Sequence, residues 1–117
     1  MARGDVLFVD LSPPPGGAGS EQAGKRPAVA VQADDTGASL PTVIVVPMTS
    51  RLKALRFPHT IRVEPSGQNG LPQSSVLLVF QLRVIDRTRI LRRLGSLEAH
   101  YLNQLDAEIP RLLDLES

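Results

Sequence analysis

Residues 19–31 read GSEQAGKRPAVAV, and the rest of the chain is organised around them. A run of prolines and glycines, PPPGG at residues 13–17, precedes this stretch and excludes a helix or a central strand there. Two valines then alternate with alanine, as in a half-buried strand. We therefore predict a long loop over residues 12–25 and a strand over residues 26–33, with Arg26 as the first residue of that strand.

Arg26 is the first candidate for chemistry. An arginine at the start of a strand has its backbone held by the sheet while its guanidinium stays accessible. This arrangement suits a forked contact with a phosphate or a carboxylate. The alternative is a surface arginine that follows a flexible loop. Loops of this length in small domains are usually functional or disordered, so the residues alone leave both interpretations open.

Further strands are predicted on both sides of this stretch. Alternating or continuous apolar residues mark Asp5–Leu11, Pro41–Thr49, His59–Glu64 and one long segment from Ser75 to Ile85. Within the second of these, Val43–Val46 is apolar without alternation, which is typical of a central strand buried on both faces.

The C-terminal part is predicted to be a helix. An apolar stripe with helical spacing is formed by Leu97, Tyr101, Leu105, Ile109 and Leu112. Ser96 is placed to cap the N-terminus, and Glu98 suits the positive end of the helix dipole. Pro110 removes a backbone donor and should kink or restart the helix. Strands followed by a helix predict a mainly β fold, a small antiparallel barrel with a C-terminal helix.

Composition narrows the class of protein. The 117 residues correspond to a single domain, 1–117, and contain no cysteine, which excludes disulfides and thiolate metal sites. No cluster of histidine, aspartate or glutamate has metal-ligand spacing, so we expect neither a metal nor a cofactor. No apolar run approaches the length of a membrane span and no signal peptide is recognisable, so we expect a cytoplasmic protein.

The net charge of +1 conceals an uneven distribution. Residues 1–50 hold three basic and five acidic residues, residues 51–93 hold nine and two, and residues 94–117 hold one and five. A middle segment of charge +7 in which arginine dominates suggests a surface that binds a polyanion through forked phosphate contacts, the alternative being ordinary solvated charge. Aromatic residues are 3% of the chain, and Phe57 is the one candidate for base stacking.

The order of several short motifs resembles the MazF/PemK/Kid family of toxin endoribonucleases. The motifs cover nearly the whole chain at about the expected spacing: Arg3-Gly4-Asp5-Val6, Asp10-Leu11-Ser12-Pro13, Gly19 to Pro27, Val45-Val46-Pro47-Met48-Thr49-Ser50, Ser75-Val76, Gln81 to Ile90 and Leu94-Gly95-Ser96-Leu97. The resemblance implies an SH3-like barrel, a homodimer and a toxin that is neutralised by a cognate acidic antitoxin with a disordered C-terminal segment.

The resemblance also implies site residues. The arginine of the Arg-Pro motif and the threonine of the second motif are catalytic in the family, and Arg26 and Thr49 match them. One branch of the family has a histidine before the Glu-Gln pair and an Arg-x-Asp pair before the glutamine of the third motif. Here these places are Ser20, Leu78 and Phe80. The chain therefore resembles the other branch, in which arginine and threonine carry most of the chemistry.

The proton acceptor for the attacking 2′-hydroxyl is left open by the sequence. Glu21 is the nearest carboxylate, although loop carboxylates are more often solvated or structural. Base recognition is expected from the 12–25 loop, the 51–58 connector and polar groups near Gln81. The RNA-binding candidates are Ser20, Gln22, Gly24, Lys25, Ser50, Arg51, Lys53, Arg56, Phe57, Gln81, Arg83 and Arg87.

The leading hypothesis is a metal-independent, sequence-specific endoribonuclease that cleaves single-stranded RNA, inhibits translation and growth, and is neutralised by its antitoxin. One alternative is a toxin of the same barrel that binds DNA gyrase without catalysis, which the Glu-Gln-x-Gly-x-Arg-Pro match disfavours. A second alternative is a non-catalytic RNA-binding barrel. The sequence distinguishes this alternative only weakly from the leading hypothesis.

Overall fold

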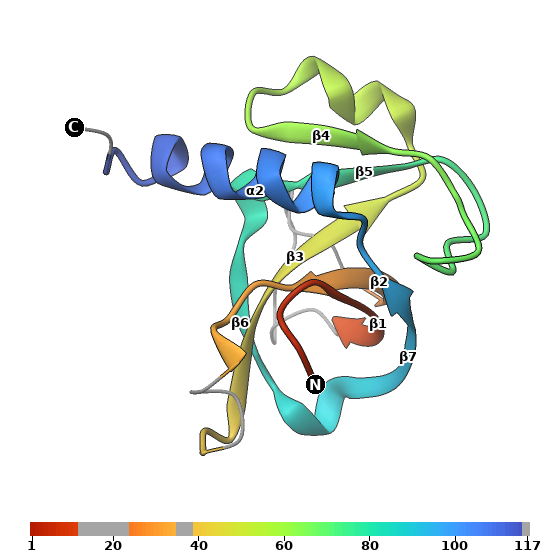
Figure 1. Ribbon diagram of the computed structural model, residues 1–117, viewed down its shortest axis with the longest axis vertical. Helices are drawn as coiled ribbons and strands as arrows, with labels where there is room; N and C mark the ends of the chain where they lie inside the picture. Colours follow the sequence, from red (N-terminus) through yellow and green to blue (C-terminus); the bar gives the residue numbers. More distant parts are fainter. Residues whose placement is uncertain (12–23, 35–38, 116–117) are drawn as a thin grey trace.

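A computed structural model of the chain describes residues 1–11, 24–34 and 39–115 (Figure 1). Its strands form one antiparallel sheet, and the chain ends in a C-terminal helix. The elements are β1 (Asp5–Leu11), β2 (Gly24–Ala30), β3 (Thr42–Thr49), β4 (Thr60–Val63), β5 (Ser75–Leu78), β6 (Arg83–Asp86), β7 (Ile90–Ser96) and α2 (Ala99–Leu112), with the 3₁₀ turns η1 (Leu52–Arg56), η2 (Val79–Gln81) and η3 (Arg87–Arg89).

The sheet has the order β4-β5-β3-β2-β1-β7, and β6 also pairs with β3. Because β6 leads through η3 into β7, the strands curl back toward β1, as the lower half of Figure 1 shows. The Arg89 guanidinium bridges this junction by donating to the backbone oxygen of Asp10 at 3.3 Å. The predicted antiparallel barrel with an appended helix is confirmed.

Two apolar cores lie on opposite faces of the curled sheet. The first packs under α2 and includes Val6, Val29, Met48, Leu77 and Leu105, with the rest of the predicted helix stripe against it. The second lies on the other face, away from α2, and is formed by Leu7, Val9, Leu11, Ala28, Ala30, Val43, Val45 and Ile85. Alternate residues of β1 and β2 therefore point into different cores, which explains why a chain of this size carries strands that are buried on both faces.

The central strand β3 is as predicted, with pairing to β2, β5 and β6. The prediction of one continuous strand from Ser75 to Ile85 is wrong. Met48 pairs with Leu77, whereas Val45 pairs with Arg83, so the partner strand holds three more residues than β3 between these pairs. The surplus forms η2. Pro47 of β3 lies opposite this break and has no N–H to donate to a continuous ladder.

Strand β2 starts and ends earlier than predicted. Pairing with β1 runs from Val6–Val29 to Leu11–Gly24, so Arg26 lies inside the strand opposite Val9 and is not its first residue. Gly24 has a φ of +81°, a conformation that favours glycine. The loop that was predicted over residues 12–25 lies outside the described residues from 12 to 23.

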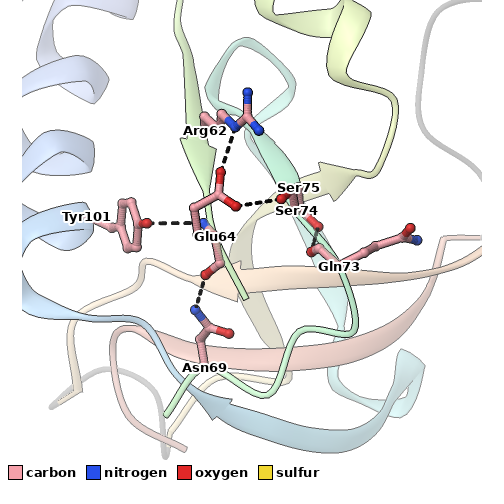
Figure 2. Close-up of polar contacts among 7 residues, drawn as sticks. All are labelled: Arg62, Glu64, Asn69, Gln73, Ser74, Ser75 and Tyr101. Atoms are coloured by element: carbon pink, nitrogen blue, oxygen red, sulfur yellow. Dashed lines mark hydrogen bonds and ion pairs between the residues drawn. The ribbon is translucent and has the colours of Figure 1, made fainter. Parts of the chain in front are cut away.

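The turn between β4 and β5 is held by hydrogen bonds to Glu98, the residue before α2. The buried Asn69 side chain donates to the Glu64 carbonyl at 2.9 Å and to the Glu98 carboxylate at 3.0 Å (Figure 2 shows the first of these bonds). Figure 2 also shows Arg62 and Ser74 donating to the Glu64 carboxylate, and these hydrogen bonds, that from Ser74 foremost, hold the pKa of Glu64 below its ordinary value. Tyr101 of α2 accepts from the Glu64 N–H at 3.0 Å.

The prediction that Ser96 caps the helix is wrong. Ser96 is the last residue of β7, a strand that was not predicted, and its hydroxyl accepts from Arg93 at 2.7 Å. The N-cap position is held by Glu98, whose carboxylate accepts from Ser66 and Asn69. The helix continues through Pro110 to Leu112. No helical segment in the described ranges has the length and apolar character of a membrane span.

Candidate active site

A cavity of about 560 Å³ opens where β3 leads into η1. The described residues that line it are Thr49, Arg51, Lys53, Ala54, Arg56 and Phe57. Three of these six carry positive charge and none is acidic, and their side chains lie at the exposed surface of η1 and its approach. A hollow of this size with a cationic wall can hold part of a polyanion.

Thr49 is the buried polar residue of this cavity, with 4% of its surface exposed. Its hydroxyl oxygen accepts from the backbone N–H of Arg51 at 3.2 Å. A hydroxyl that accepts one hydrogen bond still has its own proton to donate. Thr49 is therefore oriented by the backbone and can offer its O–H to an anionic oxygen in the cavity.

Arg26 lies on β2, the strand that pairs with β3, and Thr49 is the last residue of β3. The ladder between β2 and β3 pairs Ala28 with Pro47, and continuing this register by two residues sets Arg26 opposite Thr49. Residues two apart on a strand share a face, so both side chains project on the face of Ala28. The hydrogen-bonded ladder between β2 and β3 stops at Ala28–Pro47, and neither Pro27 nor Pro47 has a backbone N–H to extend it. Arg26 is half-buried at this open end.

Two aromatic rings and a guanidinium lie together at the cavity. Arg56 lies over the Phe57 ring, with 4.8 Å between its Cζ and the ring centroid. The Phe57 and Phe80 centroids are 5.5 Å apart and their planes are inclined by 57°. The sequence identified Phe57 and missed Phe80, which reads as a core residue of the continuous strand that η2 interrupts.

The remaining RNA-binding candidates are spread over the surface. Lys25 and Ser50 are exposed, next to Arg26 and Thr49 respectively, and Gly24 is the first residue of β2. Gln81 and Arg83 line a second cavity of about 420 Å³ together with Phe80, Leu82 and Val84. Arg87 lies apart from both cavities and lines a third, about 760 Å³, with Asp5 and Arg93 among its neighbours. Ser20, Glu21 and Gln22 lie outside the described residues.

Both histidines make contacts with side chains of α2 and line none of the cavities described above. The Nδ1 atom of His59 is 2.5 Å from a carboxylate oxygen of Glu108 on α2. His100 is exposed on the helix and its ring centroid is 3.9 Å from that of Tyr101. Within the described parts of the chain, no group of three or more histidine, aspartate or glutamate side chains could hold a metal ion.

The architecture and these motifs agree with a known protein family. A family model described as the PemK-like, MazF-like toxin of type II toxin-antitoxin systems matches residues 2–113. The chain belongs to this family. Among curated MazF-like relatives, Endoribonuclease MazF of Staphylococcus saprophyticus is 36% identical over 117 residues, which is 100% of this chain and 94% of the relative.

Solved structures of MazF-like proteins share the fold. MazF from Deinococcus radiodurans superposes with a TM-score of 0.79 at 26% identity, over 97% of this chain and 96% of that one. A mycobacterial endoribonuclease in complex with its cognate antitoxin superposes with a TM-score of 0.76 at 18% identity, over 100% and 98% of the two chains. The second likeness is evidence for the fold alone.

Proposed function

We propose that the chain is the toxin of a type II toxin-antitoxin pair, an endoribonuclease that cuts single-stranded RNA in the cytoplasm without a metal, and thereby inhibits translation. The observation that supports this proposal is that Thr49 lines a cationic cavity at the end of β3, on the strand next to the one that carries Arg26, in a MazF-like chain.

The proposed reaction uses the RNA's own 2′-hydroxyl. Its oxygen attacks the neighbouring phosphorus, the bond from phosphorus to the 5′-oxygen breaks, and a 2′,3′-cyclic phosphate remains. A base accepts the 2′ proton and an acid protonates the leaving 5′-oxygen. Arg26 and the Thr49 hydroxyl stabilise the negative charge that grows on the non-bridging oxygens. Arg26 cannot be the base because guanidinium stays protonated, and Glu21 is our candidate for that role.

Incubating the protein with a defined single-stranded RNA in EDTA tests the proposal. Cleavage with a new 2′,3′-cyclic phosphate end is the expected result. RNA binding without cleavage would favour a non-catalytic RNA-binding barrel. Neither binding nor cleavage, with inhibition of DNA gyrase instead, would favour the gyrase-binding alternative.

Removal of the Thr49 hydroxyl separates its chemistry from its packing. Thr49→Val keeps the β-branched shape of this buried residue and removes the hydroxyl, which is both the proposed donor and the acceptor of the Arg51 N–H. We expect single-turnover cleavage to slow by about 10²-fold, as for the loss of one transition-state donor. Thr49→Ser, which keeps the hydroxyl, is the control and should retain most of the rate. Equal rates for wild type and Thr49→Val would remove the hydroxyl from the mechanism.

Binding of RNA should weaken steeply with salt. Arg51, Lys53 and Arg56 line the cavity, and each phosphate they contact releases counterions when RNA binds. For single strands we expect log Kobs to fall with log salt by about 0.7 per phosphate contacted. Arg62→Ala provides a control, because Arg62 pairs with Glu64 outside the cavity. A binding constant that stays flat from low to moderate salt would contradict a phosphate-dominated site.

We also propose a homodimer that an acidic antitoxin segment controls. Apolar side chains remain exposed on η1 and beyond α2, among them Leu52, Leu55, Leu113 and Leu115, and a two-fold interface would cover such surface. The protein should sediment as a dimer at micromolar concentration. An acidic antitoxin peptide, ordering as it binds, should compete with RNA for the cationic cavity. An active monomer, or undiminished cleavage with the peptide bound, would contradict these expectations.

A further inference from the structure

We propose that Phe57, backed by Phe80 and flanked by Arg56, is a stacking platform for the nucleobase beside the scissile phosphate. This inference rests on the proposed RNA cleavage and adds a base-binding subsite to it. When RNA enters, the Arg56 guanidinium moves from the Phe57 ring to the phosphate of the same nucleotide, and the base takes its place on the ring.

The position of Phe57 supports this role. Its side chain is 43% exposed and lines the same cavity as Thr49, so a base on the ring belongs to a nucleotide close to the phosphate that Thr49 contacts. Phe80 is half-buried and its ring meets Phe57 in a tilted arrangement that aromatic pairs favour. Phe57 thus lines the cavity, and Phe80, which does not line it, packs against the Phe57 ring.

The backbone around Phe57 is fixed from several directions. The Phe57 N–H donates to the Ala54 carbonyl at 3.0 Å, and the Phe57 carbonyl accepts from the Thr60 hydroxyl at 3.0 Å. Two residues on, the His59 carbonyl accepts from the Val79 N–H at 3.0 Å, which joins this segment to η2 and hence to Phe80. A platform that is already ordered loses little conformational entropy when a base stacks on it.

The charges around the ring favour a polyanion over an apolar partner. Arg51, Lys53 and Arg56 line the cavity with Phe57, and an apolar surface seated there would leave three cations without counter-charges. Single-stranded nucleic acids instead bind where cations follow the backbone and rings stack on the bases. The Arg56 guanidinium over Phe57 shows that the exposed face of this ring accepts a flat, cationic or aromatic group.

The test uses an RNA whose cleavage site has been mapped and whose attacking 2′-hydroxyl is methylated, so that only binding is measured. Phe57→Leu keeps an apolar side chain and removes the ring face. We expect it to weaken binding by about 5- to 150-fold, the loss of one stacked base. Phe57→Tyr keeps the ring and should bind like the wild type. Leu91→Ala changes an exposed apolar residue of β7 that does not line the cavity, and serves as a second control.

A series of RNAs, each lacking one base, locates the platform. With the base next to the scissile phosphate removed, wild type and Phe57→Leu should bind equally, whereas their difference should persist for RNAs that lack a base elsewhere. Arg56→Ala should lower the salt slope of binding by about 0.7, because one phosphate contact is lost, and Phe57→Leu should leave the slope unchanged.

Three outcomes would overturn the platform: unchanged binding by Phe57→Leu, an equal loss for every abasic RNA, or an equal loss in Phe57→Tyr. Wild-type cleavage of the unmethylated RNA in EDTA is measured first. Absence of that cleavage would contradict the proposed function, and the platform with it. Normal wild-type cleavage together with one of the three outcomes would contradict the platform alone.

Discussion

Arg26→Ala is expected to slow RNA cleavage by about 10²–10³-fold in single turnover, while the protein stays folded. The expected loss follows from the continued β2–β3 register, which sets Arg26 opposite Thr49, where a planar cation can hold two oxygens of the scissile phosphate as negative charge develops on them. Folding should survive because Arg26 is only half-buried, lies near the start of β2 and is not one of the apolar residues that form either core.

Two further variants make this expectation specific. Arg26→Lys keeps the charge but not the forked geometry, so its rate should lie between those of the wild type and Arg26→Ala. Arg62→Ala removes an exposed arginine of β4 that pairs with Glu64, and its cleavage rate should match the wild type. Thermal unfolding by circular dichroism checks each variant. A folded Arg26→Ala protein with a near-normal rate would exclude Arg26 from the mechanism.

Several elements follow directly from local sequence. The alternation in β4 places Ile61 and Val63 inward, and both are buried. The helical stripe around Leu105 packs into the first core as its spacing predicts. Arg26 and Thr49 were predicted from family motifs, Arg26 also from its expected place as the first residue of a strand, and the structure has them on the adjacent strands β2 and β3. Their catalytic roles, like those of the RNA-binding candidates, remain predictions.

Other features depend on contacts between distant residues. The division of the predicted 75–85 strand into β5, η2 and β6 arises because both strands pair with β3 in registers that differ by three residues. No local pattern encodes that difference. Phe80 lies in η2, and its contact with Phe57 depends on this interruption, so the sequence could identify one ring and not its partner. Strand β7 was missed because its two adjacent arginines interrupt the alternation of apolar and polar residues by which β4 was recognised.

A large loss of stability is expected for Gly95→Ala. Gly95 of β7 is buried where the strand passes under the turn that holds Asn69. A Cβ at this position would lie 2.2 Å from the Gln68 carbonyl oxygen and 2.7 Å from the Asn69 carbonyl carbon. Both obstacles are backbone atoms, and the Ser96 N–H holds the turn close by donating to the Gln68 carbonyl at 2.9 Å. The clash can therefore be relieved only by moving β7 away from the turn.

We expect Gly95→Ala to lower the free energy of unfolding by about 3 kcal/mol or more, which corresponds to a fall in Tm on the order of 10 °C. Gly67→Ala is the matched control from the same turn, since no atom lies within 4 Å of a Cβ built there, and it should be nearly neutral. Equal Tm values for the two variants would contradict the close approach. Because Asn69 also donates to Glu98 at the start of α2, separating β7 from the turn should loosen the helix that packs on the first core.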